Sequence, residues 1–153
     1  MVSGINYDKP TKGAWHRCLL VDGTAITDPG GMGVRDLSLS WWNFSKAKIA
    51  AAELRGTTHF FATNGQIYEG GVGPARFLVT GEAGVNQQSI DVHFSNCSFW
   101  GELHFDYATV FTALGGLASS LTVTKNATNG LVQLLTGIVQ NDGTNVKMRN
   151  VSI

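Results

Sequence analysis

Residues 92–98 read VHFSNCS, and near-copies occur at 39–45 (LSWWNFS) and 146–152 (VKMRNVS). In each copy two apolar residues alternate with one other residue, and an asparagine, an apolar residue and a serine complete the phrase. Alternation with a period of two places the apolar side chains on one face of a strand. Asparagine tolerates the left-handed backbone conformation of a sharp corner. The phrase therefore predicts a half-buried strand, a corner and a second strand.

Asparagines in weaker copies of the phrase extend the pattern, so that successive asparagines stand 21, 32, 30 and 24 residues apart. Repeats of this length predict stacked structural units, in which asparagine amides can hydrogen-bond along the stack. The predicted ladder consists of Asn43, Asn64, Asn96, Asn126 and Asn150. The copy at Asn126 departs from the pattern, because Thr122 and Thr124 occupy its apolar positions. Either a bulge shifts the strand there or the repeat ends locally. Chance recurrence of Asn-x-Ser/Thr in a polar chain remains the alternative.

Composition favours one domain with little free charged surface. The chain has 153 residues, of which 14% are charged and 43% are hydrophobic, whereas about 25% charged residues are usual. Oligomerisation would explain the low charge. A net charge of zero argues against nucleic acid as a partner. No apolar stretch is long enough for membrane insertion, and no secretory signal follows Met1.

The chain divides into an irregular N-terminal segment, residues 1–32, and a repetitive domain, residues 33–153. One strand is possible at 16–22 within the first part. Residues 46–55 have helical propensity, but the alternation of their apolar residues favours a strand slightly. The glycine-rich segments 68–75 and 113–120 are predicted to leave the repeat as loops. Neither Gly-rich run, at 30–33 or at 70–73, continues as a phosphate-binding loop, so the sequence predicts no cofactor.

Tryptophans at outward positions are candidate binding residues. The alternation predicts that Trp41 points inward, and that Trp42 and Trp100 point outward. An exposed tryptophan can stack on a sugar ring or anchor a subunit contact. A loop of the same chain covering the indole is the third possibility.

Carboxyl and imidazole side chains alternate along two short segments. Asp91 and His93 share one strand face, as do Glu102, His104 and Asp106. If the two segments lie side by side, Asp91 and Glu102 could reach the separation of about 6.5–9.5 Å that inverting glycoside hydrolysis requires. They are the predicted catalytic pair, with His93, His104 and Asp106 as glycan-binding neighbours. An ordinary solvated strand face is the alternative, and no ligand spacing predicts a metal site.

The segments 33–39 and 94–99 resemble the right-handed parallel β-helix of the pectate-lyase-like superfamily, and the resemblance extends over about residues 33–153. The expected fold is therefore an all-β, single-stranded parallel β-helix of about five coils. The low charge, the missing signal and the end of the chain at 150–153 are together similar to the C-terminal part of a bacteriophage tailspike. This resemblance implies a homotrimer in the virion tail that binds, and in some members depolymerises, bacterial surface polysaccharide. Synthesis in the reducing host cytoplasm fits two unpaired cysteines, Cys18 and Cys97.

Two further functions remain open at this point. The chain could be a freestanding polysaccharide lyase or hydrolase of the pectate-lyase type, or a structural trimerisation module without activity. The resemblance supplies no active-site motif, so whether the protein is an enzyme is not decided by the sequence.

Overall fold

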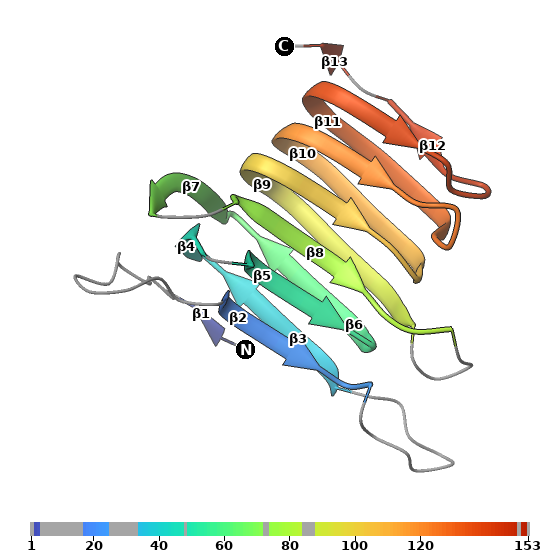
Figure 1. Cartoon of the computed structure of the whole chain (residues 1–153), viewed down its shortest axis with the longest axis horizontal. Helices are drawn as coiled ribbons and strands as arrows, with labels where there is room; N and C mark the ends of the chain where they lie inside the picture. Colours follow the sequence, from blue (N-terminus) through green and yellow to red (C-terminus); the bar gives the residue numbers. More distant parts are fainter. Residues whose placement is uncertain are drawn as a thin grey trace.

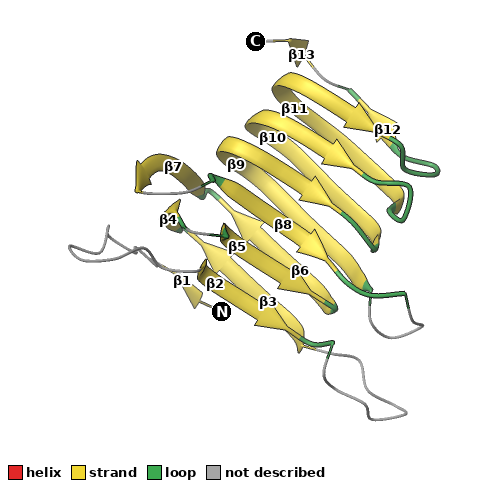
Figure 2. Cartoon of the chain, in the orientation of Figure 1, coloured by secondary structure: helices red, strands yellow, loops and turns green. Residues whose placement is uncertain are grey.

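The computed structural model describes residues 2–3, 17–24, 34–47, 49–71, 74–83, 88–149 and 151–152. Regular structure in these residues consists of strands joined by short loops, as Figure 2 shows. The strands form one 13-stranded sheet, and all of its pairings are parallel. Among the described residues, no helix is long and apolar enough to span a bilayer. The predicted all-β class with a parallel sheet is confirmed.

Short connections join most of the strands from β3 onward, whereas β1, β2 and β3 are farther apart in the sequence (Figure 1). Their bounds are β1 (Val2–Ser3), β2 (Arg17–Asp22), β3 (Val34–Ser40), β4 (Asn43–Lys46), β5 (Ala50–Arg55), β6 (Thr57–Thr63), β7 (Gln66–Gly71), β8 (Arg76–Thr80), β9 (Ser89–Phe105), β10 (Ala108–Val123), β11 (Thr128–Asn141), β12 (Lys147–Met148) and β13 (Val151–Ser152).

The long strand β9 pairs along its length with β6, then β7, then β8. The chain therefore repeats the path that the three shorter strands took before it, and β10 and β11 repeat it again. Three lanes result. Lane A contains β3, β6 and the beginnings of β9–β11, lane B contains β4, β7 and the middles of β9–β11, and lane C contains β2, β5, β8 and the ends of β9–β11. Figure 1 shows the successive passes lying side by side in chain order.

Inward positions of the three lanes form an aromatic core. Trp42 packs on Phe44, Phe77 and Phe99 with ring centroids 5.1–6.2 Å apart. Each fully buried aromatic side chain contributes about 1.5–3 kcal/mol, and each ring pair adds about 0.5–1.5 kcal/mol. At Gly65 any Cβ would lie 1.9 Å from the Trp42 indole. Glycine is therefore required there, because the Trp42 ring from the preceding pass of the chain occupies the space that a side chain would need.

A row of positive φ angles crosses lane A at one register position. Its members have φ between 54° and 60° and are Asp36, His59, Asp91, Val110, Asn129 and Asn145. Asp, Asn and His adopt this left-handed conformation more readily than other residues, whereas a β-branched residue does so at a cost. The kink residues are exposed or half-buried, and buried residues alternate with more exposed ones after the kink.

A second row of positive φ angles makes the corner between lanes A and B. It consists of Trp41, Asn64, Asn96 and Gly115, with φ of 54°, 50°, 52° and 67°. Asn96 Nδ2 donates a hydrogen bond to Asn64 Oδ1 over 2.8 Å. This step of the predicted asparagine ladder is present in the structure.

The ladder as a whole is wrong. Asn43 lies in lane B, paired with Gln66, and Trp41 takes the corner position instead. Asn126 lies at the corner between lanes C and A, where it donates a hydrogen bond to Asp106 over 3.0 Å. Asn150 lies outside the described residues. The physical reason is that a corner selects a backbone conformation, which Trp and Gly also supply here.

Two segment predictions have opposite outcomes. The strand expected within 46–55 is confirmed by β5. The loop expected at 113–120 is wrong, because these residues continue β10 through the corner at Gly115 and Gly116. The possible strand at 16–22 is present as β2, which pairs with β5. The remainder of segment 1–32, apart from β1 and residues 23–24, lies outside the described residues.

Val110 holds a left-handed φ that a β-branched side chain tolerates poorly, so Val110→Asn is expected to stabilise the fold. We expect the free energy of unfolding to rise by about 1 kcal/mol, measured by urea denaturation. Val139→Asn is the matched control, because Val139 is 42% exposed against 43% for Val110 and has no positive φ. Equal effects of the two changes would contradict the strain at Val110.

Candidate functional site

The two neighbouring tryptophans point in the directions opposite to those predicted. Trp41 is 71% exposed, whereas Trp42 is buried in the aromatic core. The left-handed φ of Trp41 shifts the alternation by one residue at the corner, which is why a strict period of two gives the wrong faces. Trp42 is therefore a core residue and presents no ring face to a ligand, and Trp41 is the exposed platform that the sequence reasoning missed.

Trp41 borders a shallow groove of about 390 Å³. The corner row supplies the amides of Asn64 and Asn96 to this groove, and lane B supplies the amide of Gln66 and the hydroxyl of Ser98. The lining residues are Trp41, Trp42, Asn64, Gly65, Gln66, Asn96 and Ser98. None of them carries a charge, so the groove offers an aromatic ring and neutral hydrogen-bonding groups.

One of the residues that line this groove, Trp42, has an unpaired polar group. Among the described residues, the buried Trp42 Nε1 has no hydrogen-bond partner. It lies against Gly65, another lining residue, where a Cβ would be 2.1 Å from it. A buried donor without a partner costs about 1–3 kcal/mol. The fold therefore accepts an energetic cost beside the exposed Trp41.

Lane A carries a chain of carboxyl and imidazole groups on β3, β6 and β9. Asp91 Oδ1 lies 2.7 Å from His93 Nε2, and His59 lies 3.1 Å from Asp36 and 3.7 Å from Asp91. The second ring nitrogen of His93 lies 2.8 Å from Thr112 Oγ1. These contacts occupy the carboxylates and imidazoles with one another.

Glu102 and His104 form a separate pair in lane C. Glu102 lies 3.1 Å from His104 Nδ1 and 3.0 Å from Arg76 Nε. Burial raises the pKa of Glu102, but hydrogen bonds from His104 and Thr122 and the charges of His104 and Arg76 outweigh it and hold the pKa below its ordinary value. Glu102 is therefore a carboxylate at neutral pH and is poorly suited to donate a proton as a general acid.

The predicted catalytic pair is wrong in its geometry. Asp91 and Glu102 belong to one strand, β9, where Asp91 lies in the part that pairs with β6 and Glu102 in the part that pairs with β8. They lie in different lanes and do not face each other across neighbouring strands. The similar sequences at 91–94 and 102–105 are two parts of the single strand β9.

The other candidate residues have distinct positions. His93 and His104 lie apart for the same reason as their carboxylates. Asp106 accepts hydrogen bonds from Thr124 over 2.5 Å and from Asn126 over 3.0 Å, so it ties a corner. Trp100 is exposed in lane B, as predicted, outside the groove. In the part of the chain that the structure describes, no group of three or more His, Cys, Asp or Glu side chains could hold a metal ion.

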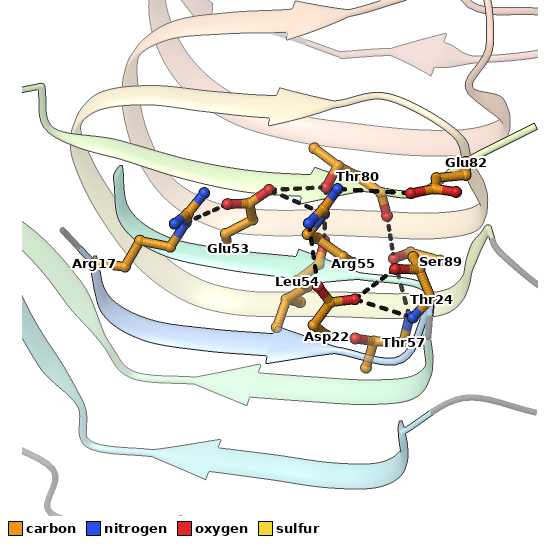
Figure 3. A network of polar contacts seen from close by, with 10 residues as sticks. All are labelled: Arg17, Asp22, Thr24, Glu53, Leu54, Arg55, Thr57, Thr80, Glu82 and Ser89. Atoms are coloured by element: carbon orange, nitrogen blue, oxygen red, sulfur yellow. Dashed lines mark hydrogen bonds and ion pairs between the residues drawn. The ribbon is translucent and has the colours of Figure 1, made fainter. Parts of the chain in front are cut away.

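A network of charged residues joins β2, β5 and β8 in lane C (Figure 3). The buried carboxylate of Glu53 accepts a hydrogen bond from Arg17 and another from Thr80 over 3.3 Å. Arg55 lies 3.5 Å from Glu53 and 3.1 Å from Asp22. Each charge in this network has a partner, which indicates a clamp across three strands rather than an open binding site.

Two further pKa values follow from burial and its compensation. Burial raises the pKa of Asp22, but hydrogen bonds from Thr24 and the charge of Arg55 outweigh it and hold the pKa below its ordinary value. Burial raises the pKa of the Cys97 thiol to about 11. Cys97 is therefore an unreactive core residue, as its predicted inward position requires.

Comparisons with protein-family models, curated protein sequences and solved structures give no match to this chain. The resemblance to tailspikes and pectate-lyase-like proteins therefore remains a prediction from sequence.

Glu53→Gln tests the clamp in lane C. Loss of the carboxylate leaves Arg17 and Arg55 without their shared partner, so we expect the free energy of unfolding to fall by about 2 kcal/mol. Glu82→Gln is the control, since Glu82 is exposed and lies 3.8 Å from Arg55, and its loss should cost at most about 0.5 kcal/mol. Chemical denaturation at neutral pH measures both. A cost for Glu53→Gln no greater than that of the control would exclude the clamp.

Proposed function

We propose that this protein is a tailspike-type receptor-binding module, a right-handed parallel β-helix that recognises bacterial surface polysaccharide through the groove beside Trp41. The observation that carries the proposal is the exposed indole of Trp41 at a corner position that the fold would fill better with asparagine.

The β-helix is supported by the repeated path through lanes A, B and C, with parallel pairing from each pass to the next. Parallel strands joined by crossover connections are almost always right-handed, which supports the proposed hand. A stack of this kind presents long, rigid outer faces, and rigid faces suit recognition of an extended polymer.

Trp41 is costly for folding at its position. Asn64 and Asn96 occupy the next two positions of the corner row and hydrogen-bond to each other. A tryptophan with a left-handed φ costs about 1–3 kcal/mol and leaves a large apolar ring in water. Residues that break a local rule in this way are expected at functional sites. Ligand binding gives the exposed indole a role that folding does not.

The groove lining favours a sugar over other ligands. An indole face packs on the apolar face of a pyranose ring, and amide and hydroxyl groups pair with sugar hydroxyls. Asn64, Asn96, Gln66 and Ser98 supply such groups within the groove. The absence of charged lining residues argues against a phosphate-rich ligand.

Binding is favoured over depolymerisation. Hydrolysis of a glycosidic bond needs two carboxyl groups on either side of it, and the groove lining contains none. The freestanding lyase or hydrolase is therefore the weaker alternative. A purely structural module would bind no polysaccharide, which a binding measurement tests. The proposed site of action is the virion tail.

The experiment measures binding of the full chain to capsule and lipopolysaccharide preparations from a panel of bacteria. Where the wild type binds, Trp41→Ala and Trp41→Asn should weaken binding at least about tenfold, which is about 1.4 kcal/mol. Trp41→Asn should also raise the free energy of unfolding by about 1 kcal/mol, because asparagine fits the left-handed φ.

Trp100→Ala is the matched control, because Trp100 is exposed but does not line the groove, and it should bind as the wild type does. Unchanged binding by Trp41→Ala would exclude the groove as the site. A wild type that binds none of the preparations would favour the structural module.

A further inference from the structure

Three side chains of lane A join a hydroxyl, an imidazole and a carboxylate in series. Thr112 Oγ1 lies 2.8 Å from His93 Nδ1, and His93 Nε2 lies 2.7 Å from Asp91 Oδ1. A hydroxyl beside a base that a carboxylate orients is the arrangement that activates a nucleophile in hydrolases of several unrelated folds. His93 is therefore placed to remove the proton of the Thr112 hydroxyl.

The register of the parallel strands brings these groups together. His93 of β9 pairs with Thr112 of β10 on one side and with Phe61 of β6 on the other. Phe61 stacks on the imidazole, with ring centroids 5.1 Å apart and an angle of 25° between the ring planes. The imidazole therefore has one face covered and a partner at each nitrogen, which fixes its orientation.

The carboxylate determines which nitrogen of His93 carries the proton. A carboxylate accepts hydrogen bonds, so Nε2 of the neutral imidazole is the donor to Asp91, and Nδ1 is the acceptor that faces Thr112. The second carboxylate oxygen, Oδ2, lies 3.7 Å from His59 Nε2, so Oδ1 is the oxygen that holds His93. Asp91 acts only through the imidazole and is a positioning residue.

Thr112 also lines a groove of about 290 Å³ that does not overlap the groove beside Trp41. The lining residues of this second groove belong to β10, β11 and the segment up to Lys147. His93 belongs to β9, which lies on the opposite side of β10 from β11. The hydroxyl therefore has its base on one side and space for a substrate on the other.

The second groove contains N–H donors near the Thr112 hydroxyl. Asn145 Nδ2 donates a hydrogen bond to Asn129 Oδ1 over 2.6 Å, which fixes the orientation of the Asn129 amide. Lys147 stands in the same row as Thr112, two strands away, so their Cα atoms are roughly 10 Å apart at the usual strand spacing. Amide and ammonium donors stabilise the oxyanion that forms when a hydroxyl attacks an acyl carbon.

Val110 and Leu131 give the second groove an apolar wall. Val110 is 43% exposed and has a φ of 54°, which a β-branched residue adopts at a cost. A residue that breaks a local rule in this way is expected at a functional site. Apolar surface next to a nucleophile suits a substrate with a small acyl group.

We propose that Thr112, His93 and Asp91 form a hydrolytic site for carboxylic esters of small acyl groups. Thr112 Oγ1 attacks the acyl carbon as its proton passes to His93 Nδ1, and Asn129 and Lys147 stabilise the oxyanion. Collapse of the tetrahedral intermediate breaks the bond between the acyl carbon and the alcohol oxygen, and His93 gives its proton to the leaving alcohol.

Water completes the reaction at the same residues. His93 Nδ1 takes a proton from water as the water oxygen attacks the acyl-threonine, and it returns that proton to Thr112 Oγ1 as the carboxylic acid leaves. The reaction consumes ester and water and needs no other reactant. It is independent of the proposed polysaccharide binding, because the two grooves share no described lining residue.

A similar set of side chains in lane C provides a matched control. Glu102 and His104 are two residues apart on β9, and Thr122 of β10 pairs with His104, as Thr112 pairs with His93. The Thr122 hydroxyl hydrogen-bonds to the Glu102 carboxylate, so the carboxylate and not a base engages it. Thr122→Val removes a hydroxyl from the same strand without touching the proposed nucleophile.

Hydrolysis of p-nitrophenyl acetate by the full chain tests the proposal without any polysaccharide. The wild type should release an initial burst of p-nitrophenol, and peptide mass spectrometry after an acid quench should find an acetyl group on Thr112. Thr112→Val should abolish the acetyl group and lower kcat/KM at least about a hundredfold, whereas Thr112→Ser should keep both. Thr122→Val should react as the wild type does.

Asp91→Asn separates positioning from a structural role. It should lower kcat and leave KM unchanged, because the amide holds the imidazole in the wrong tautomer while the groove is intact. Circular dichroism checks that each variant is folded. A wild type that does not hydrolyse the ester, equal rates for the wild type and Thr112→Val, an acetyl group on another residue, or a folded Thr112→Ser without the acetyl group would each overturn the proposal.

Discussion

Parallel backbone hydrogen bonding between successive passes of the chain is the constraint on which the rest of this structure depends. It places each residue beside the equivalent residues of the neighbouring passes. Residues with the same local conformation therefore line up in a row across the strands. Inward positions become an aromatic core, and a left-handed residue becomes a continuous kink or corner. A row is tolerant of sequence, because what repeats is a backbone conformation that several residue types can supply at different cost. Asp, His, Val and Asn share the kink in lane A for this reason.

The same constraint distributes groups that are close in sequence over different surfaces of the molecule. Each lane is a distinct surface, and residues close in sequence on one strand face different ways. Strand β9 alone places Asp91 with His93 in lane A, Trp100 in lane B and Glu102 with His104 in lane C. Alternation suggests that Asp91 and Glu102 are neighbours, but the path of β9 places them in different lanes.

Charge is also distributed by region along the stack. Strands β2 and β5 carry the ion pairs around Glu53, and β9 carries imidazole–carboxylate contacts of lane A. Strands β10 and β11 contain no charged residue. The attraction within a buried ion pair at best offsets the cost of removing its charges from water. The network around Glu53 therefore fixes strand register more than it adds stability. On β11 the apolar side chains Leu135 and Ile138 remain exposed.

The sequence by itself determined the class of the fold and its construction from stacked, repeating units. Alternation identified strands, the asparagine spacing indicated stacked units, and Asn64 and Asn96 were correctly placed one above the other. Only the tertiary structure decided which residues face outward after a corner. One left-handed residue shifts the alternation by a single position, which exposes Trp41 and buries Trp42, and no pattern of residue types marks Trp41 as that residue. Register across passes of unequal length likewise decided that Arg17 meets Glu53 and that Asp91 does not meet Glu102, because loop lengths between strands vary while the hydrogen-bonded spacing does not.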